Sequence, residues 1–167
     1  SYTDFHYLRS VWQNTTEKDA LLGVSMTGIA SMEVFKYNLK VASKIVKNEN
    51  KRIANLIGIN VAARTTCVKP AGTTSLVLGT SSGIHAWHDD YYIRRLRIGK
   101  NEAIYTYLKE NLPDLVEDCV EKPHIQAILS MPQKAPNNAV IRTEAVLDFL
   151  ERIKTVSNDW VSTGHSN

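Results

Sequence analysis

The stretch Cys67–Val77, CVKPAGTTSLV, places a lysine, a proline, a glycine and three hydroxyl residues between two apolar runs. β-Branched residues precede Pro70, and Leu76 and Val77 follow the hydroxyls, which predicts a strand, a tight turn and one or two turns of helix. A glycine-containing turn from a strand into a helix presents unpaired backbone amides at the positive end of the helix dipole. The stretch therefore indicates an α/β fold and is a candidate phosphate-binding loop.

Each residue of this loop has a part in that interpretation. Pro70 fixes the turn, and Gly72 lets the backbone approach a ligand closely. Lys69 adds positive charge, and three hydroxyls add donors: Thr73, Thr74 and Ser75. The stretch does not follow the Walker pattern GxxxxGK[ST], and a threonine here can simply cap a short helix without any ligand. The residues alone leave both interpretations open.

Upstream of the loop, the apolar spacing predicts two helices. The first follows Thr3 as N-cap, and its apolar stripe consists of Phe5, Leu8, Val11 and Trp12. Residues 21–32 are apolar and small, which indicates a buried strand or turn leading into a helix. From Met32 to about Ile57 an apolar face alternates with lysines, which predicts a long amphipathic helix ended near Gly58, with the lysines on its solvated face.

Downstream of the loop, strands and helices alternate. Strands are predicted at residues 91–98, 115–120 and 125–132. Helices are predicted at about residues 101–111 and from Thr143, as N-cap, to about Gly164. The last helix carries one apolar stripe, made of Val146, Phe149, Leu150, Ile153, Val156 and Trp160. No repeat or low-complexity linker divides the chain, so the pattern predicts one α/β unit.

Length, charge and cysteine content exclude several classes of protein. The chain has 167 residues, 43% of them hydrophobic, and a net charge of +3, which suits one globular domain rather than a protein that coats a polyanion. No apolar run approaches the roughly 20 residues that span a bilayer, and the first ten residues do not resemble a signal peptide. We therefore expect a cytoplasmic protein with no membrane partner. Cys67 and Cys119 lie far apart without CxxC spacing and are predicted to be buried, reduced thiols.

A histidine pair offers a second candidate site. His85 and His88 stand close to Asp89 and Asp90, and imidazole and carboxylate groups are common metal ligands. A His-x-x-His pair in a loop, without two further ligands at fixed spacing, is a weak indication of a metal site. No metal is therefore expected.

The basic run at residues 94–100 offers a third candidate, because two tyrosines flank it as they would on a nucleic-acid-binding strand. Strand alternation sends Arg94 and Arg95 to opposite faces, so the run does not build a single basic surface. Binding of nucleic acid is therefore not expected.

Three segments in order carry a resemblance to a known family: LLGVSMTGI at residues 21–29, TTCVKPAGTTSLVLGTSSGIHAWH at residues 65–88, and YYIRRLRI at residues 91–98. The middle segment is the most specific, because a KPxGTxS turn followed by SSGIH is a long, ordered pattern. Together the segments resemble the catalytic subunit of ribonucleotide reductase, most closely its adenosylcobalamin-dependent class. Flanking segments that begin at Trp12 and Met131 also fit the later region of that family, so the resemblance covers nearly the whole chain.

The resemblance implies a fold, an activity and partners. Members of the family form a ten-stranded α/β barrel from two halves of parallel strands, and residues 1–167 are expected to supply the second half as a partial barrel domain. The implied activity is reduction of ribonucleotides to deoxyribonucleotides by thiyl-radical chemistry, with adenosylcobalamin as cofactor of the whole enzyme. The implied partners are the ribonucleotide substrate and the remainder of the barrel, in the same or a partner chain.

The resemblance assigns no catalytic residue to this chain. The family's Asn-Pro-Cys-x-Glu motif and its C-terminal cysteine pair do not occur in the sequence, and neither Cys67 nor Cys119 stands in an equivalent place. The implied role is substrate binding, since the counterpart of the loop holds the substrate phosphates in that family. Ala71 stands where relatives often carry Ser or Thr. The residues expected to bind substrate are Lys69, Pro70, Ala71, Gly72, Thr73, Thr74, Ser75, Gly83 and His85.

Two alternatives stay open on the sequence alone. One is a non-catalytic chain, a split-gene subunit or remnant, that binds nucleotide phosphate or completes a barrel with a partner chain. The other is a small nucleic-acid-binding domain built on the basic strand, which a steep salt dependence of oligonucleotide binding would reveal.

Overall fold

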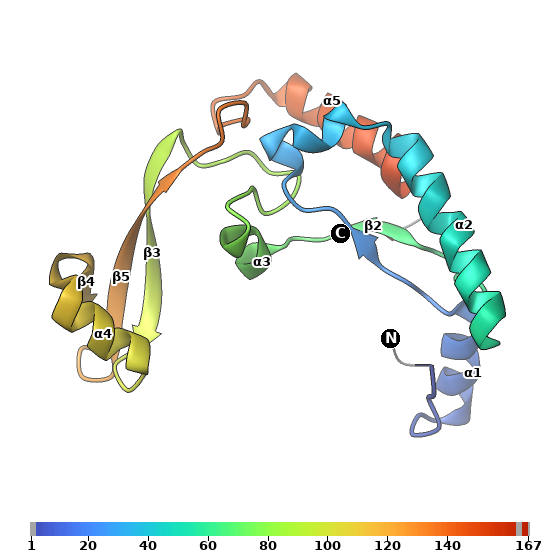
Figure 1. Cartoon of the computed structure of the whole chain (residues 1–167), viewed down its shortest axis with the longest axis horizontal. Helices are drawn as coiled ribbons and strands as arrows, with labels where there is room; N and C mark the ends of the chain where they lie inside the picture. The colour runs from blue at the N-terminus through green and yellow to red at the C-terminus, as the bar shows by residue number, and fades with distance from the viewer. Residues whose placement is uncertain (1–2, 163–164, 167) are drawn as a thin grey trace. The chain divides into compact units, whose positions relative to one another are not determined.

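The computed structural model describes residues 3–162 and 165–166 (Figure 1). Its helices are α1 (Ser10–Asp19), α2 (Leu39–Ile57), α3 (Gly72–Val77), α4 (Ala103–Asn111) and α5 (Val146–Val156). Its strands are β1 (Val24–Ser25), β2 (Thr66–Val68), β3 (Tyr91–Gly99), β4 (Val116–Asp118), β5 (Gln126–Lys134) and β6 (His165–Ser166). Shorter turns are the 3-10 segments η1 (Ile29–Ser31), η2 (Glu33–Lys36) and η3 (Pro113–Leu115), and the π-helical turn η4 (Ser157–Val161).

The chain divides into two compact units, residues 1–87 with 137–167, and residues 88–136. The sequence pattern gives no sign of this division, because no linker composition marks either boundary. The assignment of residues 1–167 to one partial barrel domain stays a prediction. Among the described residues, no helix combines the length and apolarity needed to cross a membrane.

A small parallel sheet organises the first unit. Its strand order is β1-β2-β6, and both pairings are parallel, with Ser25 opposite Cys67 and Cys67 opposite His165. The predicted strand before Pro70 and the predicted short helix after it are confirmed as β2 and α3. In Figure 1 the chain runs from the carboxyl end of β2 directly into α3, so the candidate loop lies at the carboxyl end of the central strand of this sheet.

The core of the first unit joins segments from both ends of the chain. Its buried apolar residues are Ile29, Leu39, Val156, Trp160 and Val161. The indole N–H of Trp160 donates to the carbonyl of Cys67 at 2.9 Å, and the Thr66 hydroxyl donates to the Val161 carbonyl at 3.4 Å. The turn η4 is thereby bound to the strand that leads into the loop.

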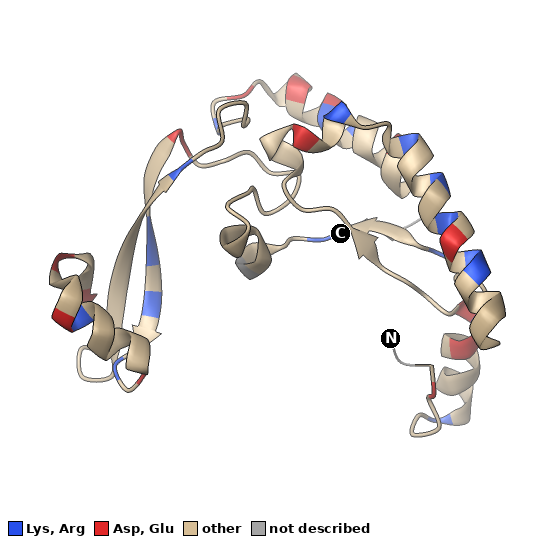
Figure 2. Cartoon of the chain, in the orientation of Figure 1, with Lys and Arg blue, Asp and Glu red and all other residues tan. Residues whose placement is uncertain are grey.

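Helix α2 is confirmed, but it begins later than predicted. It starts after Asn38, whose side chain accepts the Val41 amide at 3.0 Å, rather than at Met32. Met32 has a φ of +66°, which interrupts helical geometry, and residues 33–36 form the separate turn η2. The predicted end is correct, since Gly58 closes the helix with a φ of +75°. Figure 2 shows basic residues, drawn blue, recurring along α2.

The N-cap predicted at Thr3 is wrong. Helix α1 begins at Ser10, and the amides of Trp12 and Gln13 bond to the Arg9 carbonyl. The earlier residues form local turns instead, because the Asp4 carboxylate accepts the His6 amide at 3.1 Å.

The N-cap predicted at Thr143 is also wrong, since α5 begins at Val146 after Ala145. The preceding residues close a turn, in which the Glu144 amide bonds to the Ile141 carbonyl. Only the later part of the predicted stripe is buried, because Val146 and Leu150 are exposed. Helical structure ends at Val161, and the predicted end near Gly164 lies outside the described residues.

The second unit is an antiparallel sheet with strand order β3-β5-β4. The strands and the helix predicted for this region are confirmed as β3, β4, β5 and α4. Leu96 of β3 and Val116 of β4 both pair with Leu129 of the central strand. Helix α4 covers one face through Leu108, and this face is the core of the unit.

Candidate functional site

The candidate phosphate-binding loop presents the first amides of α3. Ala71 precedes the helix, and the first helical hydrogen bond joins the Ser75 amide to the Ala71 carbonyl at 2.8 Å. The amides of Gly72, Thr73 and Thr74 come before that bond, so they have no partner within the helix. Three successive N–H donors therefore stand at the start of α3, where the helix dipole favours an anion.

The space beside these amides is open. Gly72 and Thr74 are exposed, and a Cβ added at Gly72 would meet no atom within 4 Å. The side chain of Thr73 lies outside the described part of the structure. Ser75, in contrast, is 2% exposed, and its hydroxyl donates to the Gly72 carbonyl at 2.8 Å. Ser75 thus closes the first turn internally, while Gly72 leaves room for a ligand.

Lys69 and Pro70 form the exposed approach to the helix. The Lys69 amide donates to the Ser25 hydroxyl at 3.0 Å, which ties the end of β2 to β1. The Lys69 ammonium lies against Gly23, where an added Cβ would come within 2.8 Å of it. The lysine is therefore near the loop but directed along the neighbouring segment.

Residues 80–82, which follow α3, are hydrogen-bonded to the loop. The carbonyl of Ser82 accepts the Ala71 amide at 2.8 Å, and the Thr80 amide donates to the Ser75 carbonyl at 2.9 Å. The two ends of the first turn of α3 are thus both bonded to residues 80–82.

Residues 27–31, in turn, hold residues 80–83. The Ser81 carbonyl accepts from the Gly28 amide at 2.9 Å and from the Thr27 hydroxyl at 3.1 Å, and the Gly83 carbonyl accepts the Ala30 amide at 3.0 Å. Two of the three segments that carry the family resemblance therefore meet in space around the loop.

The structure places the two remaining site candidates differently. Gly83 is buried with a φ of +150°, and an added Cβ would lie 3.6 Å from the Lys69 carbonyl, so Gly83 adjoins the loop. His85 is exposed and stacks on Phe149 of α5, with the ring centroids 6.4 Å apart. The roles of both residues in lining a substrate pocket stay predictions.

Sequence reasoning missed two buried side chains near the loop. Ser31, 3% exposed, lies within hydrogen-bond distance of Thr80, Ser81 and Trp87. Arg152 of α5 forms a two-pronged ion pair with Glu144 and donates to the Ile84 carbonyl at 3.2 Å. A serine in a run of small residues and an arginine on a helix carry no local signal of such contacts.

The basic run on β3 meets acidic partners within its own unit. Exposure alternates along the strand, and Arg95 and Arg97 on the exposed side pair with Glu117 and Glu121. The hydrogen bond between Lys100 and Asp118, at 2.6 Å, lowers the pKa of the Asp118 carboxyl and raises the pKa of the Lys100 ammonium. These pairs offset the positive charge that suggested nucleic acid.

No group of three or more metal-ligating side chains occurs among residues 3–162 and 165–166. His88 makes an edge-on contact with the Tyr92 ring, at 5.6 Å between centroids. Cys67 and Cys119 are free and only 1% and 2% exposed, which confirms the prediction of buried reduced thiols.

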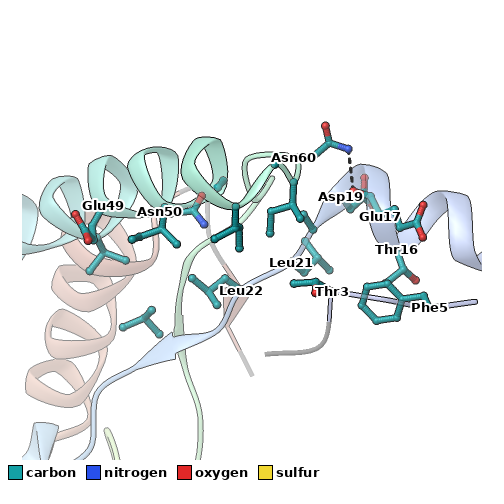
Figure 3. A pocket seen from close by; sticks show the side chains of 18 of the residues that line it. Thr3, Phe5, Thr16, Glu17, Asp19, Leu21, Leu22, Glu49, Asn50 and Asn60 are labelled. Atoms are coloured by element: carbon teal, nitrogen blue, oxygen red, sulfur yellow. Dashed lines mark hydrogen bonds between the residues drawn. The ribbon is translucent and has the colours of Figure 1, made fainter.

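A pocket of about 1120 Å³ lies between α1, the segment leading into β1, and α2 (Figure 3). Its apolar lining includes Leu21, Leu22, Ile45, Ile53 and Ile57, and acidic side chains also line it: Glu17, Asp19 and Glu49. No residue of the loop Lys69–Ser75 lines it, so the pocket and the loop are separate features.

Comparison with known proteins gives this geometry a context. No family model matches the chain. The adenosylcobalamin-dependent ribonucleoside-triphosphate reductase of Euglena gracilis is 29% identical over 151 residues, which cover 85% of this chain and 20% of that protein. Curated homologues of this chain are ribonucleotide reductases. A probable reductase of the same name from Dictyostelium discoideum is 30% identical over 115 residues, 64% of this chain and 14% of that protein. The resemblance found in the sequence is confirmed.

A solved structure agrees on the fold. The crystal structure of a B12-dependent, class II ribonucleotide reductase superposes with a TM-score of 0.80 and 17% identity, over 95% of this chain and 27% of that one. The predicted fold class, an α/β part of the reductase barrel, is confirmed. This chain spans a fifth or less of the length of the two curated reductases described above.

Proposed function

We propose that this chain is a segment of an adenosylcobalamin-dependent ribonucleotide reductase, and that the loop Lys69–Ser75 holds the phosphates of the ribonucleotide substrate. The names of the curated reductases support the activity. The observation that carries the loop assignment is the run of three amides at Gly72, Thr73 and Thr74, ahead of the first helical bond and beside open space. Converging amides and a helix dipole suit a phosphate oxygen.

The contribution of this segment to the reaction is positional. Phosphate held at the start of α3 fixes one end of the substrate, so that the ribose is presented to the reacting groups without a further loss of freedom. The Lys69 side chain is flexible and directly precedes the turn. When its ammonium moves away from Gly23, it can add electrostatic attraction for the substrate phosphates. Pro70 restricts the backbone where the strand ends, and Ser75 keeps the first turn closed.

Adenosylcobalamin is the cofactor in the names of the reductase relatives, and such a cofactor supplies the radical when it is bound. Both cysteine thiols are buried, so neither faces a substrate. The proposed role of this chain is therefore binding and orientation of substrate, with radical chemistry carried by other parts of the enzyme.

The remainder of the barrel is the expected partner. Strands β1 and β6 are each paired on one side only within the described residues, and parallel sheets are normally covered on both faces. Large apolar side chains on α2 are also exposed, among them Ile45, Leu56 and Ile57. We expect further strands and helices, in the same or a partner chain, to cover these surfaces. The cytoplasmic location stays a prediction.

Gly72→Val tests the loop assignment. The fold accommodates the change, because an added Cβ meets no atom within 4 Å and Gly72 is not among the positive-φ glycines. In the assembled reductase the branched side chain would occupy the space of the phosphate. We expect KM for the ribonucleoside triphosphate to rise at least about tenfold, since a hydrogen bond to a charged group contributes roughly 1.5–3 kcal/mol.

Ala71→Ser is the matched control at the neighbouring position. Serine is a favoured N-cap and adds a donor, so KM is expected to stay the same or fall. Thr73→Ala is the second test and is expected to raise KM less than Gly72→Val does. Unchanged KM in both Gly72→Val and Thr73→Ala would overturn the phosphate-loop assignment.

A further inference from the structure

The hydroxyl of Ser31 is fully engaged, and donor and acceptor can be assigned in each of its hydrogen bonds. Its oxygen lies 3.2 Å from the Ser81 amide nitrogen, 3.2 Å from Trp87 Nε1 and 2.9 Å from Thr80 Oγ1. The amide and the indole can only donate, so the Ser31 oxygen accepts from both with its two lone pairs. Its single hydrogen is then directed to Thr80. One buried hydroxyl thus binds three points of residues 80–87.

The backbone beside two of those points is hydrogen-bonded to both ends of the first turn of α3. The Thr80 amide donates to the Ser75 carbonyl, and the next but one residue, Ser82, accepts the Ala71 amide. A displacement of residues 80–82 therefore moves Ala71 and Ser75 together. Since the amides of Gly72, Thr73 and Thr74 lie between those two residues, their direction depends on where Ser31 holds residues 80 and 81.

The packing around Thr80 leaves little room for adjustment. Gly28 has a φ of +73°, and an added Cβ would lie 2.3 Å from Thr80 Oγ1. The Thr80 side chain thus rests on the backbone of the segment that carries Ser31. The Thr80 side chain is thus held by packing against Gly28 and by its hydrogen bond with the Ser31 hydroxyl.

We propose that Ser31 is a positioning residue for phosphate binding: through residues 80–82 it sets the direction of the amides of Gly72, Thr73 and Thr74. The proposal rests on the proposed function of the loop and extends it to a side chain 41 positions upstream of Gly72. Ser31 does not contact the substrate in this assignment. Its effect is on substrate affinity and not on the radical steps.

Ser31→Ala in the assembled reductase tests the proposal. We expect KM for the ribonucleoside triphosphate to rise roughly three- to tenfold, with kcat changed less than twofold, because only the anchor of the amides is lost. The inhibition constant of inorganic tripolyphosphate, a probe of the phosphate site alone, should rise by the same factor. A merely structural role would reduce the amount of active enzyme, lowering apparent kcat and leaving KM and the inhibition constant unchanged.

Ser43→Ala is the matched control. Ser43 is also buried, at 4% exposure, and its hydroxyl donates to the Lys40 carbonyl within the α2 region, away from the loop. We expect its KM and inhibition constant to match those of the unmodified enzyme. If Ser31→Ala does not fold, Thr80→Ala removes the acceptor of the same hydroxyl and is expected to raise KM in the same direction.

The outcomes separate this inference from the function on which it rests. A raised KM in Gly72→Val with unchanged KM in Ser31→Ala and Thr80→Ala would overturn the role of Ser31 and leave the loop assignment standing. Unchanged KM in all of these variants would overturn both. A rise in KM equal in Ser43→Ala and Ser31→Ala would also overturn the inference, because the effect would then be general to buried serines.

Discussion

Replacing Glu144 by alanine is expected to loosen the chain around the loop by leaving a buried charge unpaired. Arg152 Nη1 and Nη2 lie 2.6 and 2.7 Å from the two carboxylate oxygens of Glu144. The side chains of the arginine and the glutamate are 6% and 14% exposed. After the change, the guanidinium keeps the Ile84 carbonyl at 3.2 Å and the Phe149 ring at 5.3 Å.

The magnitude follows from this geometry. Removing one partner of a buried ion pair costs about 3–5 kcal/mol. We expect the lower end, about 3 kcal/mol, because the Ile84 carbonyl and the Phe149 ring still face the guanidinium. At about 1.4 kcal/mol per factor of ten, this corresponds to roughly 100-fold faster exchange of amides that open together with this unit.

Hydrogen–deuterium exchange read by mass spectrometry measures this effect in the assembled protein. The reporting amides are those of Trp87, bonded to the Val140 carbonyl at 2.8 Å, and of Val140, bonded to the Ala30 carbonyl at 2.9 Å. Glu49→Ala is the control, because the Glu49–Arg52 pair is more than half exposed and its loss should not change exchange in these peptides.

Two results would refute the reasoning. One is exchange in Glu144→Ala equal to that of the unmodified protein. The other is an equal acceleration in the control. A double variant, Glu144→Leu with Arg152→Met, should recover most of the lost protection, since apolar replacement of a buried pair is often neutral or stabilising.

Two further changes test the backbone near Ser31 and the charge pair of the second unit. Gly28→Ala should lower the free energy of unfolding by roughly 1–2 kcal/mol because alanine is strained in the left-handed conformation, and a steric clash with Thr80 should lower it further. The measurement is the urea midpoint followed by tryptophan fluorescence. Adding Thr80→Ala should recover only the part due to the clash, and full recovery would contradict the backbone strain. Lys100→Met should return the lowered pKa of Asp118 toward its ordinary 3.8, followed by NMR of the carboxyl carbon, where an unchanged midpoint would refute the pairing. In the unmodified protein, the Asp118 contribution to stability is complete above pH 3.8 and is lost as pH falls through the lowered pKa. The Lys100 contribution is complete below pH 10.5 and is lost as pH rises through the raised pKa.

Local signals predicted the elements around the loop. Pro70 restricts the backbone and Gly72 leaves it free, and together they define the turn between β2 and α3. Both effects act within a few residues, so the sequence shows them directly. Gly58 ended α2 for the same reason. The sequence pattern places the start of α2 too early because the apolar period continues upstream of Asn38, and nothing in that period signals the positive φ of Met32. Periodicity alone does not separate a helix from a series of short turns.

The supports of the site could not be predicted, because their partners are distant in sequence. Ser31 bonds to Thr80, Ser81 and Trp87, which are 49, 50 and 56 positions away in the sequence. Arg152 bonds to a carbonyl 68 positions away. Pattern reasoning treats each window by itself, so it finds the candidate loop and misses the side chains that hold the loop. The same limit hid the second unit, whose hydrophobic core depends on strand pairing between β3 and β5.

The hydrogen bond from Trp160 to the Cys67 carbonyl has a consequence for biosynthesis. Its partners are 93 positions apart, and the neighbouring partners Thr66 and Val161 are 95 positions apart. At about 5–20 residues per second, a ribosome needs roughly 5 to 20 s to produce that intervening chain. Throughout this interval the nascent polypeptide carries β2 without its C-terminal support. The candidate phosphate-binding loop thus acquires its final setting near the end of translation of this region, and changes in η4 should reduce the yield of correctly assembled loop before they alter its proposed binding of phosphate.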